Sequence, residues 1–391
     1  MISVEEATER LLALVVPLPS ETVPLREAAG RVLAEPVVAR QSQPPFPASA
    51  MDGYAVTVAS PAPGDRFRVI GESAAGHPFD GPLTGRDAVR IFTGAPLPEG
   101  GVRVVIQEDV TRDGDTIRLG DDLDPSDYIR PAGGDFRQGH TIDAPRRLGS
   151  REIALLAAMG HGIVPVSRRP VVAVMMTGDE LRAPGEPLAP GQITGSNGYG
   201  LAAMLEAAGA RVRRLPIARD RSGSLRTAFG LASGADLIVT IGGASVGDHD
   251  LVAGAAGEAG LELDFHKVAM RPGKPLLAGR MNGAAMVGLP GNPVSAMVCG
   301  LVFILPMLRK MLGLPPDITT STCQLAAPLA ANGARQHYMR GRRSGTGCTA
   351  ASRQDSSLFS VLAGADLLIV RPPNDPAREV GNPVEVIELP A

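Results

Sequence analysis

A glycine-rich stretch followed by two aspartates is the part of this sequence whose residue types and spacing most suggest chemistry. Gly242-Gly-Ala-Ser-Val-Gly247 follows a short apolar run, and Asp248 and Asp250 come directly after it. Glycines permit positive φ and close approach of a ligand, so backbone N–H groups and the Ser245 hydroxyl could donate to an anion. Carboxylates beside such donors suggest a phosphate held with a divalent cation. Taken alone, the stretch is equally compatible with an ordinary strand-to-helix turn, because it matches neither the dinucleotide fingerprint nor the P-loop pattern.

Four further motifs carry polar residues that could join this loop. They are Thr177-Gly-Asp-Glu-Leu181, which contains Glu180, then Arg219-Asp220, Leu289-Pro-Gly-Asn-Pro293 and the basic run from Lys267 through Arg271 to Lys274. Singly, each is better explained as surface charge, a proline turn or a solvated basic run. Together at one edge of one sheet, they would form an active cleft. Carboxylates about 5 Å apart repel by about 3 kcal/mol at an effective dielectric near 20, so converging carboxylates need a cation. With only oxygen ligands on offer, Mg2+ suits the set better than zinc.

Alternating strands and helices between Pro170 and Gly313 would bring these motifs together. The expected strands span 171–176, 211–215, 237–241, 261–267 and 284–289, and the expected helices span 199–208, 224–232 and 295–312. Leu237 to Ile241 is an unbroken, mostly β-branched run, as in strands buried on both faces. The order predicts a mostly parallel α/β sheet with helices on both faces and ligands beyond the carboxyl ends of its strands.

The flanking regions read as two small β-domains and a few helices. Short apolar segments between Gly and Pro predict strands over 67–72, 88–93, 102–110 and 116–119, and again over 323–325, 337–342, 367–370 and 384–388. A capping box of Ser3 and Glu6 predicts a first helix. A second helix is expected over 25–32, and a third over 150–159 with Ser150 as its N-cap. Asp52-Gly53, taken alone, is most simply a hairpin turn.

Composition excludes several classes of protein. The 391 residues have room for roughly two to four domains, and a net charge of −3 gives no electrostatic footprint for nucleic acid. Three widely spaced cysteines argue against a disulfide framework and a zinc site. The N-terminus lacks the regions of a signal peptide, and the longest apolar run, Met297 to Leu308, is too short to span a bilayer. We therefore expect a cytoplasmic protein with neither nucleic-acid nor membrane partners.

Six motifs in a fixed order resemble the MoeA family of molybdopterin molybdenumtransferases, which is related to the C-terminal part of gephyrin. The motifs are Ser49-Ala-Met-Asp-Gly-Tyr-Ala55, Ile91-Phe-Thr-Gly-Ala95, Thr177-Gly-Asp-Glu-Leu181, Gly242-Gly-Ala-Ser-Val-Gly247 with Asp250, Pro272-Gly-Lys-Pro275 and Leu289-Pro-Gly-Asn-Pro293. The resemblance covers nearly the whole chain. It implies an elongated protomer of four domains: a helical and extended domain split between 1–45 and 140–168, an inserted β-domain over 46–139, an α/β molybdopterin-binding domain over 169–314, and a C-terminal β-barrel domain over 315–391.

The resemblance also implies a reaction and the residues that perform it. Molybdate would be inserted into adenylylated molybdopterin with Mg2+-dependent release of AMP, in a homodimer that contacts other cofactor-biosynthesis proteins transiently. The implied catalytic residues are Asp52, Glu180, Asp220 and Asp250, of which the last three would also hold the metal. The implied substrate-binding residues are Thr93, Ser196, Asn197, Gly242, Gly243, Ser245, Gly247, Lys267, Arg271, Lys274, Pro290 and Pro293. Asp52 and Thr93 would enter the cleft from the facing subunit.

Some positions depart from the family pattern, and two alternative functions stay open. Arg271 stands where lysine is frequent, which keeps the charge and changes the hydrogen-bond geometry. Ser356-Ser357 replaces a Ser-Gly turn, and Gly134 stands where relatives usually carry glutamate. One alternative is a non-catalytic molybdopterin-binding or scaffolding protein, against which the carboxylates argue. The other is a stand-alone molybdopterin adenylyltransferase, which would leave the motif around Asp52 and the C-terminal β-domain unexplained.

Overall fold

A six-stranded α/β sheet is the centre of the computed structural model, which describes residues 1–243 and 251–389. Its strand order is β18 (Arg211–Arg214), β15 (Val171–Met176), β19 (Leu237–Ile241), β23 (Ala284–Leu289), β22 (Leu277–Met281) and β20 (Leu261–His266). The first four strands are parallel, as predicted. β22 runs antiparallel to both of its neighbours, β23 and β20, and was not predicted. Every residue of β19 is buried, because both faces of the sheet are covered.

The alternation of side chains along the strands assigns the helices to the two faces. Val172 and Val174 of β15 pack with α3 (Asn197–Ala207), α6 (Pro293–Cys299) and α7 (Leu305–Met311). Ala173 and Met175 pack on the other face with α4 (Ser222–Leu231) and α5 (Leu251–Glu258). The continuous helical stretch Pro293–Met311 is long and apolar enough to cross a membrane by length and composition alone. However, 78% of its apolar window is buried, as in the core helix of a globular fold.

The N-terminal segment differs from the sequence prediction. Helix α1 (Val4–Ala13) begins as expected, with the Ser3 hydroxyl accepting from the Glu6 N–H at 3.0 Å, and packs against α7 of the α/β region. The prediction of a second helix over 25–32 was wrong. A single 3-10 turn (Leu25–Glu27) stands there, and Gly30 then adopts a φ of +75° that ends any helix.

The part predicted as a split helical segment is therefore mainly a sheet. Its strand order is β1 (Ser20–Pro24), β14 (Ile163–Ser167), β2 (Val32–Leu33) and β13 (Arg146–Arg147). Helix α2 (Ser150–Ala158) lies beside this sheet, and its N-cap is Gly149 rather than Ser150. The Gly149 N–H donates to the Glu152 carboxylate at 3.0 Å, so the glutamate, rather than a serine hydroxyl, satisfies the helix start.

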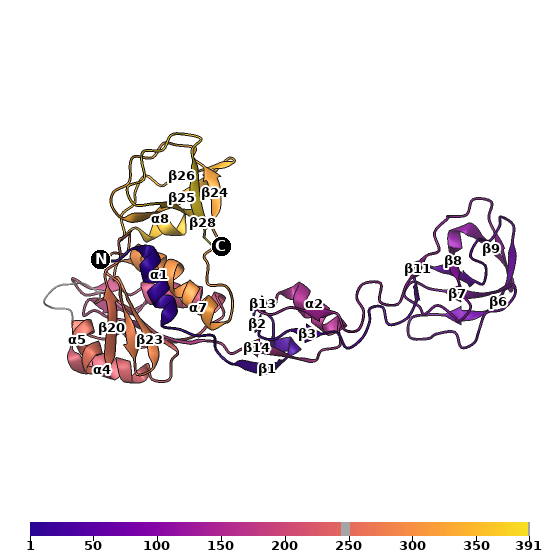
Figure 1. Ribbon diagram of the computed structural model, residues 1–391, viewed down its shortest axis with the longest axis horizontal. Coiled ribbons are helices and arrows are strands. Elements are labelled where there is room, and N and C mark those ends of the chain that lie inside the picture. The colour runs from indigo at the N-terminus through magenta and orange to yellow at the C-terminus, as the bar shows by residue number, and fades with distance from the viewer. Residues whose placement is uncertain (244–250, 390–391) are drawn as a thin grey trace.

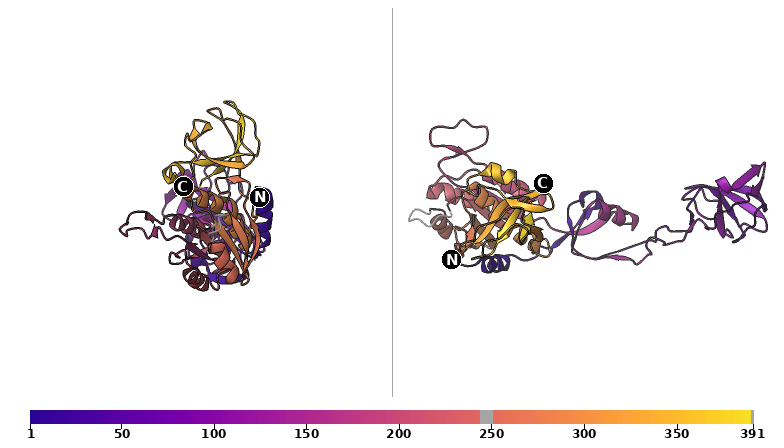
Figure 2. Two further views of the ribbon diagram at one scale, coloured as in Figure 1. Left: turned by 90° about the vertical axis from the view of Figure 1, so that its left-hand side faces the viewer. Right: turned by 90° about the horizontal axis from the view of Figure 1, so that it is seen from above.

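Two further sheets are formed by the chain between β2 and β13 and by the C-terminal region. The inserted region has the order β8 (Arg103–Ile106), β5 (Gly53–Val56), β7 (Asp87–Ile91), β6 (Arg66–Ser73), β10 (Thr116–Leu119) and β9 (Val110–Asp113). The C-terminal region has β21 (Met270–Arg271), β25 (Gln336–Ser344), β27 (Leu367–Arg371), β28 (Pro383–Glu388) and β24 (Ser321–Gln324), with β26 (Gly347–Ala350) paired to β25. Figures 1 and 2 show the inserted sheet at the far end of an elongated chain, whereas the C-terminal sheet lies against the α/β region.

Candidate functional site

A cavity of about 830 Å³ opens beyond the carboxyl ends of β15, β19 and β23. The sequence-predicted residues that line it are Glu180, Ser196, Asn197, Asp220, Gly242, Gly243, Pro290 and Pro293. They come from five separate loops, which meet because parallel strands all end at the same edge of the sheet. We call this cavity the carboxylate cleft.

Two glycines allow the floor of the carboxylate cleft to close. Gly242 has a φ of +98°, and a Cβ there would lie 2.7 Å from the Thr177 carbonyl oxygen. Gly243 has a φ of +62°, and a Cβ there would lie 2.1 Å from a Val252 methyl carbon. Side chains at these positions would meet backbone strain and a clash together. Close packing therefore requires glycine at both positions, in addition to any need for a ligand to approach the backbone.

The two described carboxylates of the predicted metal set both face the cleft. The Glu180 carboxylate folds back over Gly178, where a Cβ would lie 2.4 Å from Oε2. The Asp220 N–H donates to the Asp179 carboxylate at 3.3 Å. Partial burial raises the pKa of Asp220, and the negative charges of Asp179 and Glu180 raise that pKa further. Negative charge is thus concentrated at this end of the cleft, and Asp179 is a contributor that the sequence reasoning missed.

The third member of the predicted metal set cannot be placed. Asp250, Ser245 and Gly247 lie outside the described residues. Within 1–243 and 251–389, no three His, Cys, Asp or Glu side chains are grouped closely enough to hold a metal ion.

The cleft also has two polar groups set among its apolar walls. Asn197, at the start of α3, donates through Nδ2 to the Gly291 carbonyl at 2.7 Å, which joins two loops of the rim. Thr177 is only 5% exposed, and its hydroxyl has no hydrogen-bond partner among the described residues. A buried hydroxyl of this kind is costly unless a ligand satisfies it. Thr177 is therefore a binding candidate, although the sequence reasoning used its motif only for Glu180.

A second hollow, of about 300 Å³, adjoins the cleft and shares Pro275 and Asn292 with it. The predicted residues Arg271 and Lys274 line it, together with Arg335, Ser295, Gln354, Asp355 and Ser356. We call it the cationic hollow. The Asp355 carboxylate is engaged by Ser357, whose N–H and hydroxyl donate at 2.8 and 2.6 Å, so it offsets the positive charge without an ion pair.

Arg340 stands directly behind the cationic hollow. Its side chain is fully buried and donates through one terminal nitrogen to the Asp355 carbonyl at 2.9 Å. Its Nε and other terminal nitrogen have no partner among the described residues. An unpaired buried guanidinium is strongly unfavourable, so an anion in the hollow would stabilise it. Arg335 and Arg340 were missed because they lie about sixty residues after Lys274 and carry no motif.

Three predicted residues lie elsewhere in the single chain. Lys267 lines neither hollow. Asp52 accepts hydrogen bonds from the Thr93 N–H at 2.7 Å and hydroxyl at 2.8 Å, which lower the pKa of Asp52. The structure thus brings Asp52 and Thr93 together, as an exposed pair in the inserted sheet far from the cleft of the same chain. Their entry into the cleft of a facing subunit stays a prediction.

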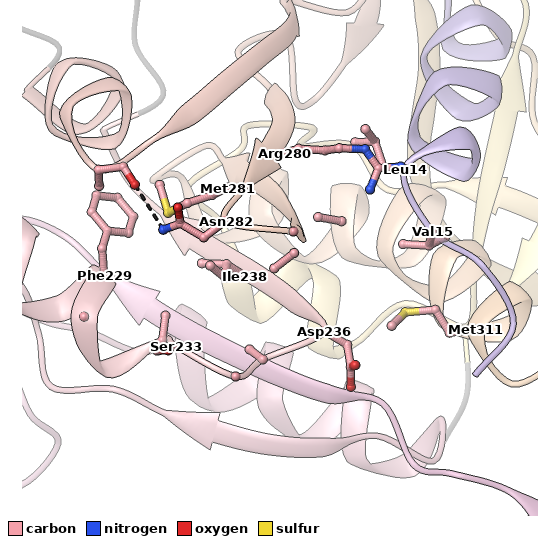
Figure 3. A pocket seen from close by; sticks show the side chains of 18 of the residues that line it. Leu14, Val15, Phe229, Ser233, Asp236, Ile238, Arg280, Met281, Asn282 and Met311 are labelled. Carbon is pink, nitrogen blue, oxygen red and sulfur yellow. Dashed lines mark hydrogen bonds between the residues drawn. The ribbon is translucent and has the colours of Figure 1, made fainter. Parts of the chain in front are cut away.

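A further cavity of about 830 Å³ lies at the opposite, amino-terminal end of the same sheet. Figure 3 shows Phe229, Ile238 and Val15 around it, with Asn282 donating to the Ala259 carbonyl at 3.1 Å. Its carboxylate, Asp236, accepts both ends of the Arg168 guanidinium at 3.0 and 2.7 Å. Since its carboxylate Asp236 is already paired with Arg168, this cavity offers less for chemistry than the cleft at the carboxyl end.

Three family models match successive parts of the chain. Residues 2–160 match the MoeA N-terminal region, described as domains I and II. Residues 173–310 match a probable molybdopterin binding domain, and residues 322–389 match the MoeA C-terminal region, described as domain IV.

Curated relatives and solved structures agree with these models. The molybdopterin molybdenumtransferase of Haemophilus influenzae is 37% identical over 317 residues, which cover 80% of this chain and 78% of that protein. Molybdopterin molybdenumtransferase 2 of Mycobacterium tuberculosis is 39% identical over 334 residues, covering 82% of each chain. A crystal structure of the molybdopterin biosynthesis MoeA protein of Pyrococcus horikoshii is 25% identical, with a TM-score of 0.84 and full coverage of both chains.

Proposed function

The chain belongs to the MoeA family, and on that premise we propose that it is the transferase of molybdenum cofactor biosynthesis that inserts molybdate into adenylylated molybdopterin and releases AMP. One observation carries the proposal. A cleft with carboxylates and glycine-lined backbone adjoins a hollow lined by arginine and lysine, and the two share Pro275 and Asn292. A reaction between one substrate with a phosphoanhydride and a second substrate that is an oxyanion needs two such neighbouring environments.

The charges divide the substrates between the two spaces. We assign the adenylylated molybdopterin to the carboxylate cleft, which is large enough for an extended ligand. The cationic hollow is smaller and has Arg271, Lys274 and Arg335 at its wall, with Arg340 behind it. Guanidinium groups present several donors to a tetrahedral oxyanion, so molybdate fits this hollow.

The acidic end of the cleft is chemically suited to Mg2+. The pKa of Asp220 is raised by burial and by Asp179 and Glu180, and a divalent cation would relieve this repulsion. Glu180 and Asp220 would hold the ion, with Asp250 as the third proposed ligand. When bound, Mg2+ would neutralise charge on the phosphoanhydride oxygens. Asn197 and the Thr177 hydroxyl would fix the substrate against the rim.

The remaining parts of the proposal concern assembly and location. We propose a cytoplasmic homodimer, in which Asp52 and Thr93 of one subunit complete the cleft of the other. The hydrogen bonds from Thr93 hold the Asp52 carboxylate in one orientation and keep it ionised, which suits a residue presented to a facing cleft. We also propose transient contact with other cofactor-biosynthesis proteins.

An HPLC assay of AMP release tests this function. Purified chain with adenylylated molybdopterin should release AMP only when molybdate and Mg2+ are both present. Glu180→Gln should abolish release while leaving the thermal unfolding midpoint unchanged, because the exposed Glu180 side chain makes no ion pair among the described residues. Glu186→Gln, an exposed glutamate in the same region, is the matched control. Substrate binding without AMP release by the wild-type chain would instead indicate a scaffolding protein.

A further inference from the structure

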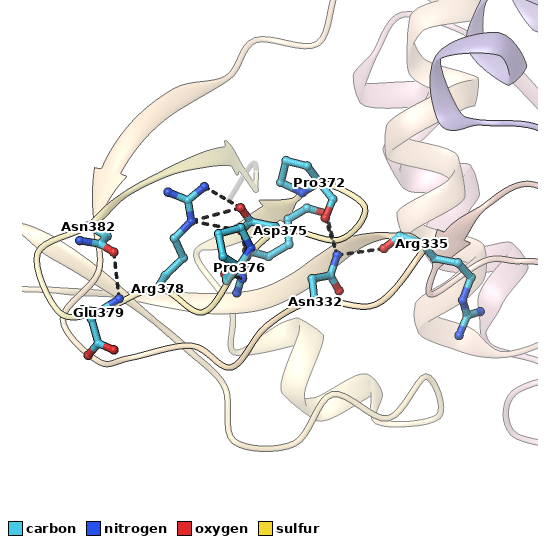
Figure 4. A network of polar contacts seen from close by, with 9 residues as sticks. Asn332, Arg335, Pro372, Asp375, Pro376, Arg378, Glu379 and Asn382 are labelled. Carbon is cyan, nitrogen blue, oxygen red and sulfur yellow. Dashed lines mark hydrogen bonds and ion pairs between the residues drawn. The ribbon is translucent and has the colours of Figure 1, made fainter.

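A network of polar contacts in the C-terminal region (Figure 4) includes Arg335, which lines the cationic hollow. Its centre is Asp375, which is 6% exposed and pairs with the guanidinium groups of Arg371 and Arg378. Arg378 donates to the carboxylate at 2.6 Å, and Arg371 also donates to the Pro376 carbonyl at 2.7 Å. These contacts fix the loop that follows β27.

Asn332 joins this loop to the one that leads into β25. Its amide nitrogen Nδ2 donates to the carbonyls of Pro372 at 2.6 Å, Arg335 at 2.9 Å and Arg371 at 3.2 Å. Its backbone N–H donates to the Asp375 carbonyl at 2.8 Å. The amide has two N–H groups, so one of them is shared between two carbonyls, and a single side chain thus joins the two loops.

Arg335 is where this arrangement reaches the hollow. Its carbonyl is held by Asn332, and Figure 4 shows its guanidinium directed away from the network. The next residue, Gln336, donates through its backbone N–H to the Ala269 carbonyl at 3.0 Å, at the start of the strand that carries Arg271. Among the described residues, the guanidinium itself makes one long hydrogen bond, 3.5 Å to the Met270 carbonyl. Its place in the hollow thus depends on the backbone rather than on a side-chain partner.

We propose that Asn332 is a positioning residue of the reaction, which sets the place of Arg335 in the cationic hollow and through it the use of molybdate. Asn332 lines neither hollow and therefore acts through Arg335 rather than by touching a substrate. Loss of Asn332 removes the donor that the three carbonyls share, of which those of Arg335 and Arg371 are part-buried, and frees the loop before β25, so Arg335 no longer has one fixed position. The inference rests on the proposed function, since it assumes that the hollow takes the oxyanion.

A double-mutant cycle tests the inference in the AMP-release assay with the full chain, Mg2+ and varied molybdate. Asn332→Ala should raise the KM for molybdate by about tenfold with a smaller change in kcat, since misplacing one charged ligand weakens oxyanion binding. Arg335→Ala should raise that KM by at least as much. In the Arg335→Ala background, Asn332→Ala should have no further effect, because two residues that act through one contact are not additive.

The control is Asn382→Ala, in the same network of loops. The Asn382 side chain accepts from the Glu379 N–H at 2.9 Å and, among the described residues, makes no hydrogen bond to the loop of Arg335. It should leave the KM for molybdate within twofold of the wild-type value. If Asn332→Ala proves insoluble, Arg378→Gln perturbs the same network from its more exposed end and should raise the KM by a smaller factor.

The outcomes separate this inference from the proposed function. Independent, multiplying effects of the two substitutions, or an unchanged KM in Asn332→Ala, would overturn the positioning role while leaving the reaction in place. Failure of the wild-type chain to release AMP would overturn the function itself, and the inference with it. A lowered unfolding midpoint with unchanged KM would reduce Asn332 to a purely structural residue.

Discussion

His337 provides a quantitative test of the charge in the cationic hollow. The side chain is 7% exposed, and its Nε2 has no hydrogen-bond partner among the described residues. Burial, together with the smaller effect of the positive charges of Arg271, Arg340, Arg371 and Arg335, lowers the pKa of His337 to about 4. His337 is therefore neutral at physiological pH, and the positive charges around it disfavour its protonation.

The lowered pKa predicts how stability depends on pH. The unfolded chain binds a proton at His337 near pH 6.5 and the folded chain only near pH 4, so stability falls as pH drops through this window. At about 1.4 kcal/mol per pH unit, the complete window corresponds to about 3 kcal/mol, of which about 2 kcal/mol is lost between pH 7 and pH 5. Glutamine at this position does not titrate. The free energy of unfolding of the wild type minus that of His337→Gln should therefore decrease by about 2 kcal/mol between pH 7 and pH 5.

Two measurements check this reasoning. Urea unfolding of both proteins at pH 7 and pH 5 gives the change in the difference, in which all other titrating groups cancel. NMR of ring-labelled histidine gives the midpoint of His337 directly, assigned by its absence in His337→Gln. Added molybdate should raise that midpoint, because an anion between Arg271 and Arg335 offsets their repulsion. A midpoint between 6 and 7 without molybdate would refute the strong positive field on which the oxyanion assignment depends.

Three further predictions concern the two hollows and their supports. Asp220→Asn should lower AMP release by about 100-fold without changing the unfolding midpoint, and a variant with more than half the wild-type rate would contradict the metal role. Gly243→Ala should destabilise the chain by about 1–3 kcal/mol, because its Cβ would meet Val252 at 2.1 Å, whereas Gly234→Ala, with open space around it, should show only the cost of its positive φ in the same urea titration. Asp375→Asn should lower the free energy of unfolding by about 3–5 kcal/mol at pH 7, because it removes one partner of a buried ion pair. Hydrogen bonding to Arg378 holds the pKa of Asp375 below 3.8. The difference in stability between wild type and variant should therefore vanish as pH falls through that lowered value.

The centre of the fold was predictable because local signals and burial agree there. Leu237–Ile241 and Ala284–Leu289 are strands with the predicted bounds, since apolar runs of that length are buried on both faces. The meeting of Glu180, Asp220 and Gly242 in one cleft followed from the parallel order of the strands. The strand Leu277–Met281, which lies between β23 and β20, was missed because it follows a proline-rich stretch and interrupts the alternation of strand and helix.

Other features depend on contacts between residues distant in sequence. The segment after Leu25 has apolar residues at helical spacing, but Val32 and Leu33 are buried in a sheet whose partner strands lie more than a hundred residues later. Lys267 appeared to belong to the basic run, whereas it has a φ of +79° and lines neither hollow. Arg340 carries no motif, and only its complete burial marks it as part of the site.

The C-terminal sheet forms one wall of the cationic hollow, a role that the composition of this region did not indicate. Strand β21, which ends in Arg271, pairs in parallel with β25, so that Arg271 lies opposite His337 in the C-terminal sheet. Arg271 and Lys274 thus come from the α/β side of the seam, and Arg335 and Arg340 come from the other. The Asp355 carboxylate, which Ser357 holds in place, offsets only part of the charge of these four cations, and an oxyanion would relieve the remaining repulsion. The pairing of these two strands therefore makes the hollow a product of both regions, and removing the C-terminal region would leave the carboxylate cleft without its neighbouring anion site.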